Sequence, residues 1–326
     1  MLKYLFKTLE INTLRQIHQI MSCCMIPKVK ELKLISIYLY ICDIYNSDLK
    51  HTCQRFSNNS EPEFTDQELL TIYLFAMHEE QKFKIKQIYN YTLDYLLSWF
   101  PKLPSYEAFN MRLNRMSETF RILAISILDK FQPSDCQLNE SLLDSMPIIT
   151  CSGKRSGKVA REITDKGFCS TKGMYYYGLK LHALGFCRPY KLPFPEQFVL
   201  SAASENDLNV FKQAWSDIEN RKFFGDKIYL DHEYFQCLAK TSNSFMLTPI
   251  KGVKGQPEVI KMFDKAANDL FSTAVSKVRQ PIESLFNWLI EITDIQRASK
   301  VRSTKGLLVH IFGRIAAAFI FLIFNS

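Results

Sequence analysis

The hydrophobic pattern of the first third of the chain predicts helices. Thr65 and Glu68 have the spacing of a capping box, with Thr65 as the N-cap, and the apolar residues that follow recur at helical spacing. Prolines and polar turns separate this segment from two further helical patterns. The expected helices cover 66–77, 88–99 and 105–116. We therefore predict an α-helical N-terminal domain at 1–130.

The pattern changes near residue 136, where short apolar runs rich in strand-favouring residues begin. Strands are expected at 141–148, 174–184, 197–203, 222–230 and 244–249, and helices at 206–219, 233–240 and from 259 to the end with interruptions near 281 and 297–306. Strands that first follow one another and then alternate with helices predict a mixed α/β domain. We place this domain at 136–326.

Composition narrows the class of protein only slightly. The 326 residues are 47% apolar, which is enough for a packed core, and the net charge is +8. A positive charge fits a polyanionic partner, although many soluble proteins that bind no nucleic acid are as basic. The nine cysteines include no CxxC pair, which favours a reduced, cytoplasmic compartment over a disulfide framework.

Neither end of the chain predicts a membrane segment. Lys3, Lys7 and Arg15 interrupt the early apolar residues, so no signal peptide is expected there. The apolar run 307–324 contains His310 and Arg314, which would be costly in lipid. We expect this run to be a buried helix and expect no membrane partner.

Three acidic residues stand in apolar surroundings. Asp144 lies within a strand, Asp226 follows Phe223-Phe224-Gly225, and Glu283 lies just inside a helix that Pro281 could start. A buried carboxylate is costly unless it is paired, hydrogen-bonded or bound to a cation. Three that converge would need a divalent ion, and oxygen ligands suit Mg²⁺. Each also has a simpler explanation, as a turn cap, the start of a loop, or a partner of the helix dipole.

The order of these segments resembles a known family. LLDSMPI (142–148), FFGDKIYLD (223–231) and RQPIESLFNWLIE (279–291) together resemble the transposase DDE domain of bacterial insertion sequences. The segments YYYGLKLHAL (175–184) and ASKVRSTKGLLVH (298–310) are similar to the insertion-sequence 982 group, and PSYEAFNMRLNRM (104–116) extends the resemblance into the helical part. The resemblance implies an RNase H-like mixed sheet with flanking helices.

The resemblance also implies roles for the acidic residues. Asp144 matches the first catalytic aspartate, at the centre of the first strand, and Asp226 the second, on the fourth strand. Glu283 matches the closing glutamate, on a helix that packs against the sheet. Together they would bind Mg²⁺, for which Mn²⁺ can substitute. Asp231 is the competing second aspartate, ranked lower because it lies past the strand end.

Arg279 precedes Glu283 by four residues, as the family's phosphate-contacting arginine does. Related enzymes often have a tyrosine three residues before that arginine and a lysine seven after the glutamate. Ser276 and Ile290 occupy these places here, which puts roles built on those two side chains in doubt.

The implied activity is that of a DNA transposase. Cleavage at the ends of the element would be followed by attack of the freed 3′-hydroxyl on target DNA, through two-metal phosphoryl transfer. The implied partners are double-stranded DNA, as terminal repeats and target, and a second copy of the chain in the synaptic complex. A DNA nuclease of the same fold without strand transfer and an inactive DNA-binding remnant remain alternatives. The protein would act in the cytoplasm, on the nucleoid.

Basic residues supply the candidate DNA contacts. Lys180 and His182 alternate with leucines, so they project from one face of a strand, either toward a phosphate beside Asp144 or as the solvated face of an edge strand. Arg112 and Arg115 either read the element ends or pair with Glu107 or Glu118. Two further segments are typical of phosphate contact. They contain Lys154, Arg155, Lys158, Arg161, Lys166 and Lys172, and Arg297, Lys300, Arg302 and Lys305.

Overall fold

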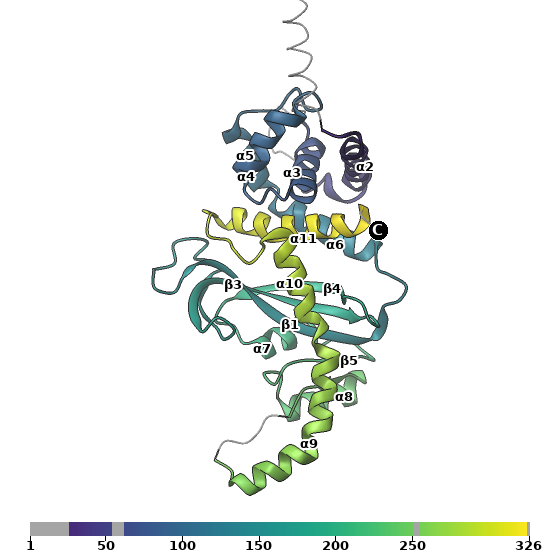
Figure 1. Cartoon of the computed structure of the whole chain (residues 1–326), viewed down its shortest axis with the longest axis vertical. Coiled ribbons are helices and arrows are strands. Elements are labelled where there is room, and N and C mark those ends of the chain that lie inside the picture. Colours follow the sequence, from purple (N-terminus) through teal and green to yellow (C-terminus); the bar gives the residue numbers. More distant parts are fainter. Residues whose placement is uncertain (1–25, 54–61, 251–254, 325–326) are drawn as a thin grey trace, which may run out of the picture. The chain divides into compact units, whose positions relative to one another are not determined.

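The computed structural model describes residues 26–53, 62–250 and 255–324. The chain divides into two compact units (Figure 1), of which the first comprises 1–123 and 316–326 and the second 124–315. The division falls inside a helix, slightly before the expected boundary at 130–136. The last residues of the chain group with the first unit, whereas the sequence pattern assigned them to the second domain. Each unit is described separately below.

The described elements of the first unit are helices. They are α2 (Lys28–Ile44), the π-helix η1 (Tyr45–Leu49), α3 (Asp66–Glu80), α4 (Ile85–Tyr91), the π-helix η2 (Thr92–Leu96), α5 (Tyr106–Arg115), the beginning of α6 (Ser117–Lys130) and the end of α11 (Thr304–Phe324). The capping box is confirmed, because the Thr65 hydroxyl accepts a hydrogen bond from the Glu68 amide at 3.2 Å and the Glu68 carboxylate accepts one from the Thr65 amide. Residues 69–78 of α3 are all buried, so α3 forms the centre of this unit.

The second unit contains a mixed six-stranded sheet, which confirms the predicted α/β class. Its strands are β1 (Gln137–Ser152), β2 (Asp165–Cys169), β3 (Met174–Cys187), β4 (Phe194–Ala202), β5 (Lys222–Phe224) and β6 (Phe245–Leu247). They lie in the order β2-β3-β1-β5-β6, and β4 also pairs with β3. β3 is antiparallel to β1, β2 and β4, whereas β5 is parallel to both β1 and β6. β1 is therefore an interior strand with one antiparallel and one parallel neighbour.

Helices cover both faces of this sheet. They are α7 (Asp207–Ala214), α8 (His232–Ser242), α9 (Glu258–Arg279) and α10 (Pro281–Thr293). Phe211 and Leu238, from α7 and α8, pack in one cluster with Leu143 of β1. α10 packs against β1 as well. Its Ile282 lies beside Gly185, which pairs with Leu142. Because neighbouring strand residues point to opposite faces, α10 lies on the face opposite α7.

Three expectations about the strands need correction. The strand expected at 222–230 ends at Phe224, because the chain turns at Asp226, whose carbonyl accepts a hydrogen bond from the Tyr229 amide at 3.0 Å. The basic segment after β1 lies outside the expected strands, yet it contains β2. β3 is bordered on both sides, so it is not an edge strand.

The apolar C-terminal run forms helix α11, which is long and apolar enough to cross a membrane by length and composition alone. Of its most apolar window, 67% is buried inside the structure, as in the core helix of a soluble protein. His310 Nε2 donates a hydrogen bond at 2.8 Å to the carbonyl of Ile295, and Arg314 donates one to the carbonyl of Thr293. Both polar side chains thus have protein partners.

Candidate active site

Asp144 lies in the middle of β1, on the face that α10 covers. It faces Ala183 of β3 across the ladder, and its Oδ1 accepts a hydrogen bond from the Ser145 amide at 2.8 Å. The side chain is 24% exposed. Burial raises the pKa of Asp144 to about 6, and the nearby Glu283 and Asp207 carboxylates add to the rise, although Arg279 and the Ser145 amide oppose it.

Arg279 joins two of the three predicted carboxylates. Its Nη1 lies 2.8 Å from Asp144 Oδ2 and its Nη2 lies 2.6 Å from Glu283 Oε1. The pairing with Glu283 follows from helical geometry, because the two residues are four apart and the chain stays helical through Gln280. Burial lowers the pKa of Arg279, but Asp144, Glu283 and Asp226 outweigh it and raise that pKa. Arg279 therefore pairs with Asp144 and Glu283, and the charge of Asp226 acts on it as well.

Asp226 approaches this site from the end of β5. The parallel register pairs Leu142 with Phe224, the last residue of β5, and Asp226 follows two residues later, where the chain turns. The charge of Asp226 helps to raise the pKa of Arg279. The Asp226 side chain is exposed, and its Oδ1 accepts a hydrogen bond from the Lys227 amide at 2.6 Å. The Asp226 carboxylate is therefore accessible to a ligand, whereas that of Asp144 is mostly buried.

Asp231, the competing aspartate, has a structural part in the fold. It is the N-cap of α8, where its carboxylate accepts a hydrogen bond from the Tyr234 amide at 3.1 Å. Its other oxygen pairs with Lys212 at 2.6 Å, and this hydrogen bond lowers the pKa of Asp231. The ranking of Asp226 above Asp231 therefore agrees with their positions.

The three predicted carboxylates offer the oxygen ligands that suit a divalent cation. Among the described residues, no group of three or more acidic, histidine or cysteine side chains has the spacing of a metal site. The guanidinium of Arg279 instead takes up oxygen atoms that an ion would use. A carboxylate whose pKa is raised by burial, as that of Asp144 is, gains from a close cation. The residues therefore fit Mg²⁺ if Arg279 moves away from Asp144 and Glu283.

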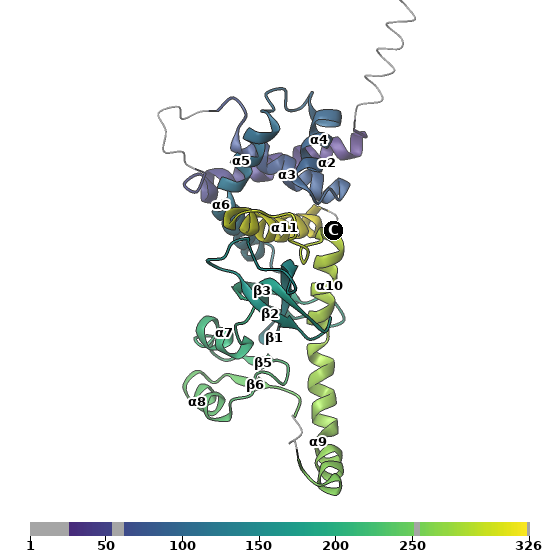
Figure 2. The same cartoon turned by 90° about the vertical axis from the view of Figure 1, so that its left-hand side faces the viewer.

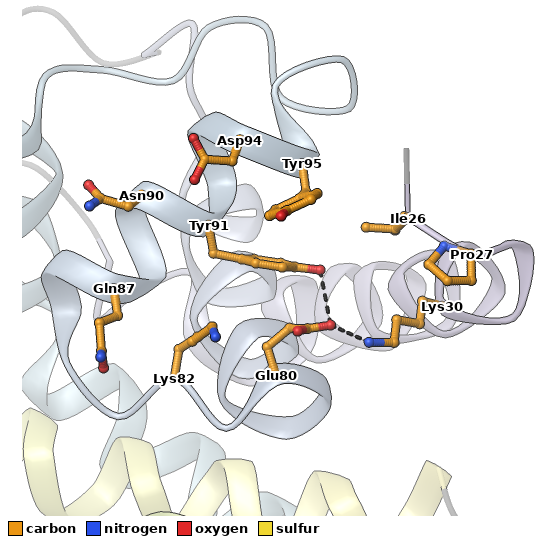
Figure 3. Close-up of a pocket in the computed structure, with 10 residues that line it drawn as sticks. All are labelled: Ile26, Pro27, Lys30, Glu80, Lys82, Gln87, Asn90, Tyr91, Asp94 and Tyr95. Atoms are coloured by element: carbon orange, nitrogen blue, oxygen red, sulfur yellow. Dashed lines mark hydrogen bonds and ion pairs between the residues drawn. The ribbon is translucent and has the colours of Figure 1, made fainter. Parts of the chain in front are cut away.

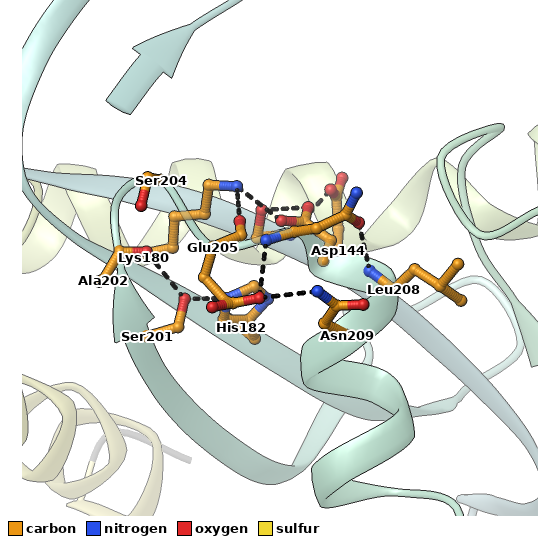
Figure 4. A network of polar contacts seen from close by, with 12 residues as sticks. Asp144, Lys180, His182, Ser201, Ala202, Ser204, Glu205, Leu208 and Asn209 are labelled. Carbon is orange, nitrogen blue, oxygen red and sulfur yellow. Dashed lines mark hydrogen bonds and ion pairs between the residues drawn. The ribbon is translucent and has the colours of Figure 1, made fainter. Parts of the chain in front are cut away.

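Lys180 and His182 lie on the opposite face of the sheet from Asp144. His182 pairs with Ser145 and Lys180 with Pro147, so their side chains share the α7 face (Figure 4). Lys180 Nζ contacts Asp207 Oδ1 at 2.8 Å and donates to the Glu205 carbonyl at 2.6 Å. These residues therefore lie on the face opposite Asp144 and on an interior strand, and phosphate contact by them stays a prediction.

The hydrogen bonds around Lys180 and Asp207 extend to Ser145, the residue next to Asp144. Asp207 accepts a second hydrogen bond from the Ser145 hydroxyl at 2.7 Å. His182 is completely buried and its Nε2 lies 2.8 Å from the Ser201 hydroxyl. Burial lowers the pKa of His182 to about 4, so its imidazole is neutral at physiological pH. Sequence reasoning missed Asp207, because its position at a helix start does not reveal that it turns inward.

The two basic segments come together in space. The Ile149 amide donates to the Gln296 carbonyl at 2.8 Å, and the Ala298 amide donates to the Ile149 carbonyl at 2.9 Å. Lys172 also donates to the Gln296 side chain, and Thr304 to Glu162. The basic side chains on these segments are all exposed, and we call them the basic surface. Its members are Lys154, Arg155, Lys158, Arg161, Lys166, Lys172, Arg297, Lys300, Arg302 and Lys305. Ile149, on which both segments meet, is five residues or roughly 17 Å along β1 from Asp144.

In the first unit Arg112 is engaged by protein groups. It donates to the carbonyl of Phe64 and to Asp66, with a side chain only 12% exposed. Glu118 pairs with Arg121, so neither acid suggested by the sequence is its partner. Arg115 is exposed. Its role in reading DNA ends, like that of Arg112, stays a prediction.

The first unit also contains an open cavity of about 520 Å³ that the sequence did not indicate (Figure 3). Glu80 lies in its wall, pairs with Lys30 and accepts a hydrogen bond from the Tyr91 hydroxyl at 3.2 Å. Burial, with Glu80 beside it, raises the pKa of Tyr91. Lys30, Glu80 and Tyr91 thus form one set of polar contacts in the cavity wall.

Comparisons of the chain with protein-family models, with curated proteins and with solved structures gave no match. The functional argument therefore depends on the residues and their geometry.

Proposed function

We propose that the chain is a DNA transposase of the insertion-sequence type, with Asp144, Asp226 and Glu283 as its catalytic carboxylates. The observation that carries the proposal is that Asp144 and Glu283, 139 positions apart, both pair with the guanidinium of Arg279, whose pKa the charge of Asp226 also raises. Sequence order alone does not bring these groups together.

The sheet supports an RNase H-like interpretation. Asp144 lies on the first strand, inside the sheet, as the resemblance requires. β5 is the parallel neighbour of β1, and it takes the place of the expected fourth strand because β2 and β4 both border β3. Glu283 lies in the first turn of a helix that packs against β1. Asp144 and Glu283 thus lie on the kinds of element that the resemblance implies, whereas Asp226 lies two residues past the end of β5.

Each side chain has a definite task in this proposal. Asp144, Asp226 and Glu283 would hold the metal ions, which activate the attacking oxygen and stabilise the leaving one when bound. Arg279 neutralises the carboxylates before substrate arrives, and would then turn its fixed fork of donors to the scissile phosphate. Asp144, with its raised pKa, must lose its proton to take part. The basic surface would bind the DNA backbone without regard to sequence.

The test is an assay with Mg²⁺, a labelled duplex made from DNA that flanks the coding sequence, and a supercoiled plasmid as target. We expect cleaved 3′ ends and products in which the label is joined to the plasmid. Cleavage without joining would support a nuclease of the same fold. DNA binding by folded protein without cleavage in Mg²⁺ or Mn²⁺ would contradict the proposed activity.

A further inference from the structure

Helix α9 has a wide apolar face that no described residue of the chain covers. Only Val275 of its 22 residues is buried. Phe263 is 72% exposed and Leu270 84%, values that are unusual for large apolar side chains. In Figures 1 and 2 the first part of the helix extends away from the strands of its own unit. The sequence analysis expected a helix here but did not identify this face.

The apolar residues form one continuous stripe. At 100° per residue they occupy about half of the helix circumference, and the buried Val275 lies roughly 130° from the centre of the stripe. The charged residues between 259 and 274 all lie outside it. We call this surface the α9 stripe. It consists of Val259, Ile260, Met262, Phe263, Ala266, Ala267, Leu270, Phe271 and Ala274. The stripe therefore points away from the sheet.

The order of residue sizes in the α9 stripe is nearly symmetric about its middle. Counting outward from the central Ala266 and Ala267, Phe263 corresponds to Leu270, and Met262 to Phe271. A two-fold interface brings the same patch of both copies together. In an antiparallel pair about this midpoint, Phe263 of one copy lies level with Leu270 of the other. Two small residues at the centre allow close approach of the helices, with large side chains packing on either side.

We propose that the α9 stripe is a homodimer interface, in which α9 of a second copy packs antiparallel about the point between Ala266 and Ala267. The paired length is about 24 Å. One pair of helices buries less than a standard stable interface, so the dimer should be reversible at micromolar concentration. Dimerisation through the α9 stripe needs neither metal nor DNA. The dimer proposal and the proposed transposase activity can therefore be tested, and can fail, independently of each other.

Sedimentation velocity of the full chain, over about 1 to 100 µM, tests the interface. We expect the wild type to pass from monomer to dimer and Phe263→Glu to weaken dimerisation at least about 30-fold, the effect of one lost hot-spot residue. Lys261→Glu, on the polar side of α9, should dimerise as the wild type does. Circular dichroism and thermal melting confirm that the variants fold. A wild type that stays monomeric, or a dimer unaffected by Phe263→Glu, would overturn the proposal.

Cysteine cross-linking tests the direction of pairing, with the wild type as the control for the nine native cysteines. In an antiparallel pair the two copies of residue 266 are offset by only about 1.5 Å along the helices, whereas those of residue 274 lie roughly 22 Å apart. Ala266→Cys should therefore give an intermolecular disulfide that Ala274→Cys does not. Cross-linking of Ala274→Cys alone would refute antiparallel pairing.

Discussion

At the scale of single residues, the charge of Asp144 is the most costly feature of the site. Burial favours its protonated form, and Arg279 compensates only in part, since the pKa remains raised at about 6. The folded state therefore binds a proton between pH 3.8 and about 6 that the unfolded state has lost. Stability contributed by this group falls as pH rises through that window, and the full penalty applies above it.

Asp144→Asn should therefore stabilise the protein at pH 8 in the absence of divalent ions. A rise in pKa from 3.8 to about 6 corresponds to a gain of up to about 3 kcal/mol. Urea unfolding at pH 8 and at pH 3.5 measures the difference in unfolding free energy between the variant and the wild type. This difference should be smaller at the lower pH. Addition of Mg²⁺ should stabilise the wild type and leave the variant unchanged. A variant less stable than the wild type at pH 8 would contradict this account of Asp144.

Lys180 holds the other face of β1 in place through Asp207. Lys180→Ala would leave the buried Asp207 carboxylate without its cation, at a cost of about 3 kcal/mol. Unfolding experiments on Lys180→Ala, Asp207→Asn and the double variant form a cycle, in which the double variant should recover part of the loss. Unchanged stability with lost DNA cleavage would instead favour direct phosphate contact by Lys180.

At the scale of elements, periodicity predicted the helices and most strands, because each buries a face whose spacing is visible in the sequence. Three features escaped it. β2 is short and lies in a charged segment, β5 ends after three residues at a turn, and the inward turn of Asp207 depends on partners far along the chain. The charges of Asp144 and Asp226 both act on Arg279 because β1 pairs with β5, and one sequence does not specify this pairing.

Gly178 is required for the pairing of β1 with β3. A Cβ at this position would overlap the carbonyl oxygen of Ile148, beside the bulge after Ile149. Gly178→Ala should therefore cost about 2–4 kcal/mol. Gly185→Ala on the same strand is the control, because its Cβ would lie 3.3 Å from the nearest atom and needs only a small adjustment. Equal melting temperatures of the two variants would refute this role of Gly178.

At the scale of the whole molecule, two basic segments more than a hundred residues apart form one surface. Composition showed the charges, but only the pairing of Ile149 with the segment at 296–298 brings them together. If this surface binds the DNA backbone, its residues act additively through released counterions.

Arg155→Ala and Arg302→Ala should each lower the slope of log affinity against log salt concentration by about 0.9, and the double variant by about twice that. Fluorescence anisotropy with a labelled duplex measures the slopes. Lys240→Ala, an exposed lysine on α8, is the control and should leave the slope unchanged. Equal effects of all three changes would mean that the basic surface is not the binding site.

The central claim is that Asp226 is a catalytic carboxylate and that Asp231 is a helix cap. Mg²⁺-dependent cleavage of the flanking-sequence duplex by wild type, Asp226→Asn and Asp231→Asn tests it most directly. We expect Asp226→Asn to melt as the wild type does and to lose cleavage. Asp231→Asn should keep cleavage, because asparagine also caps helices. Cleavage by Asp226→Asn at the wild-type rate, or its selective loss in a folded Asp231→Asn, would contradict the account.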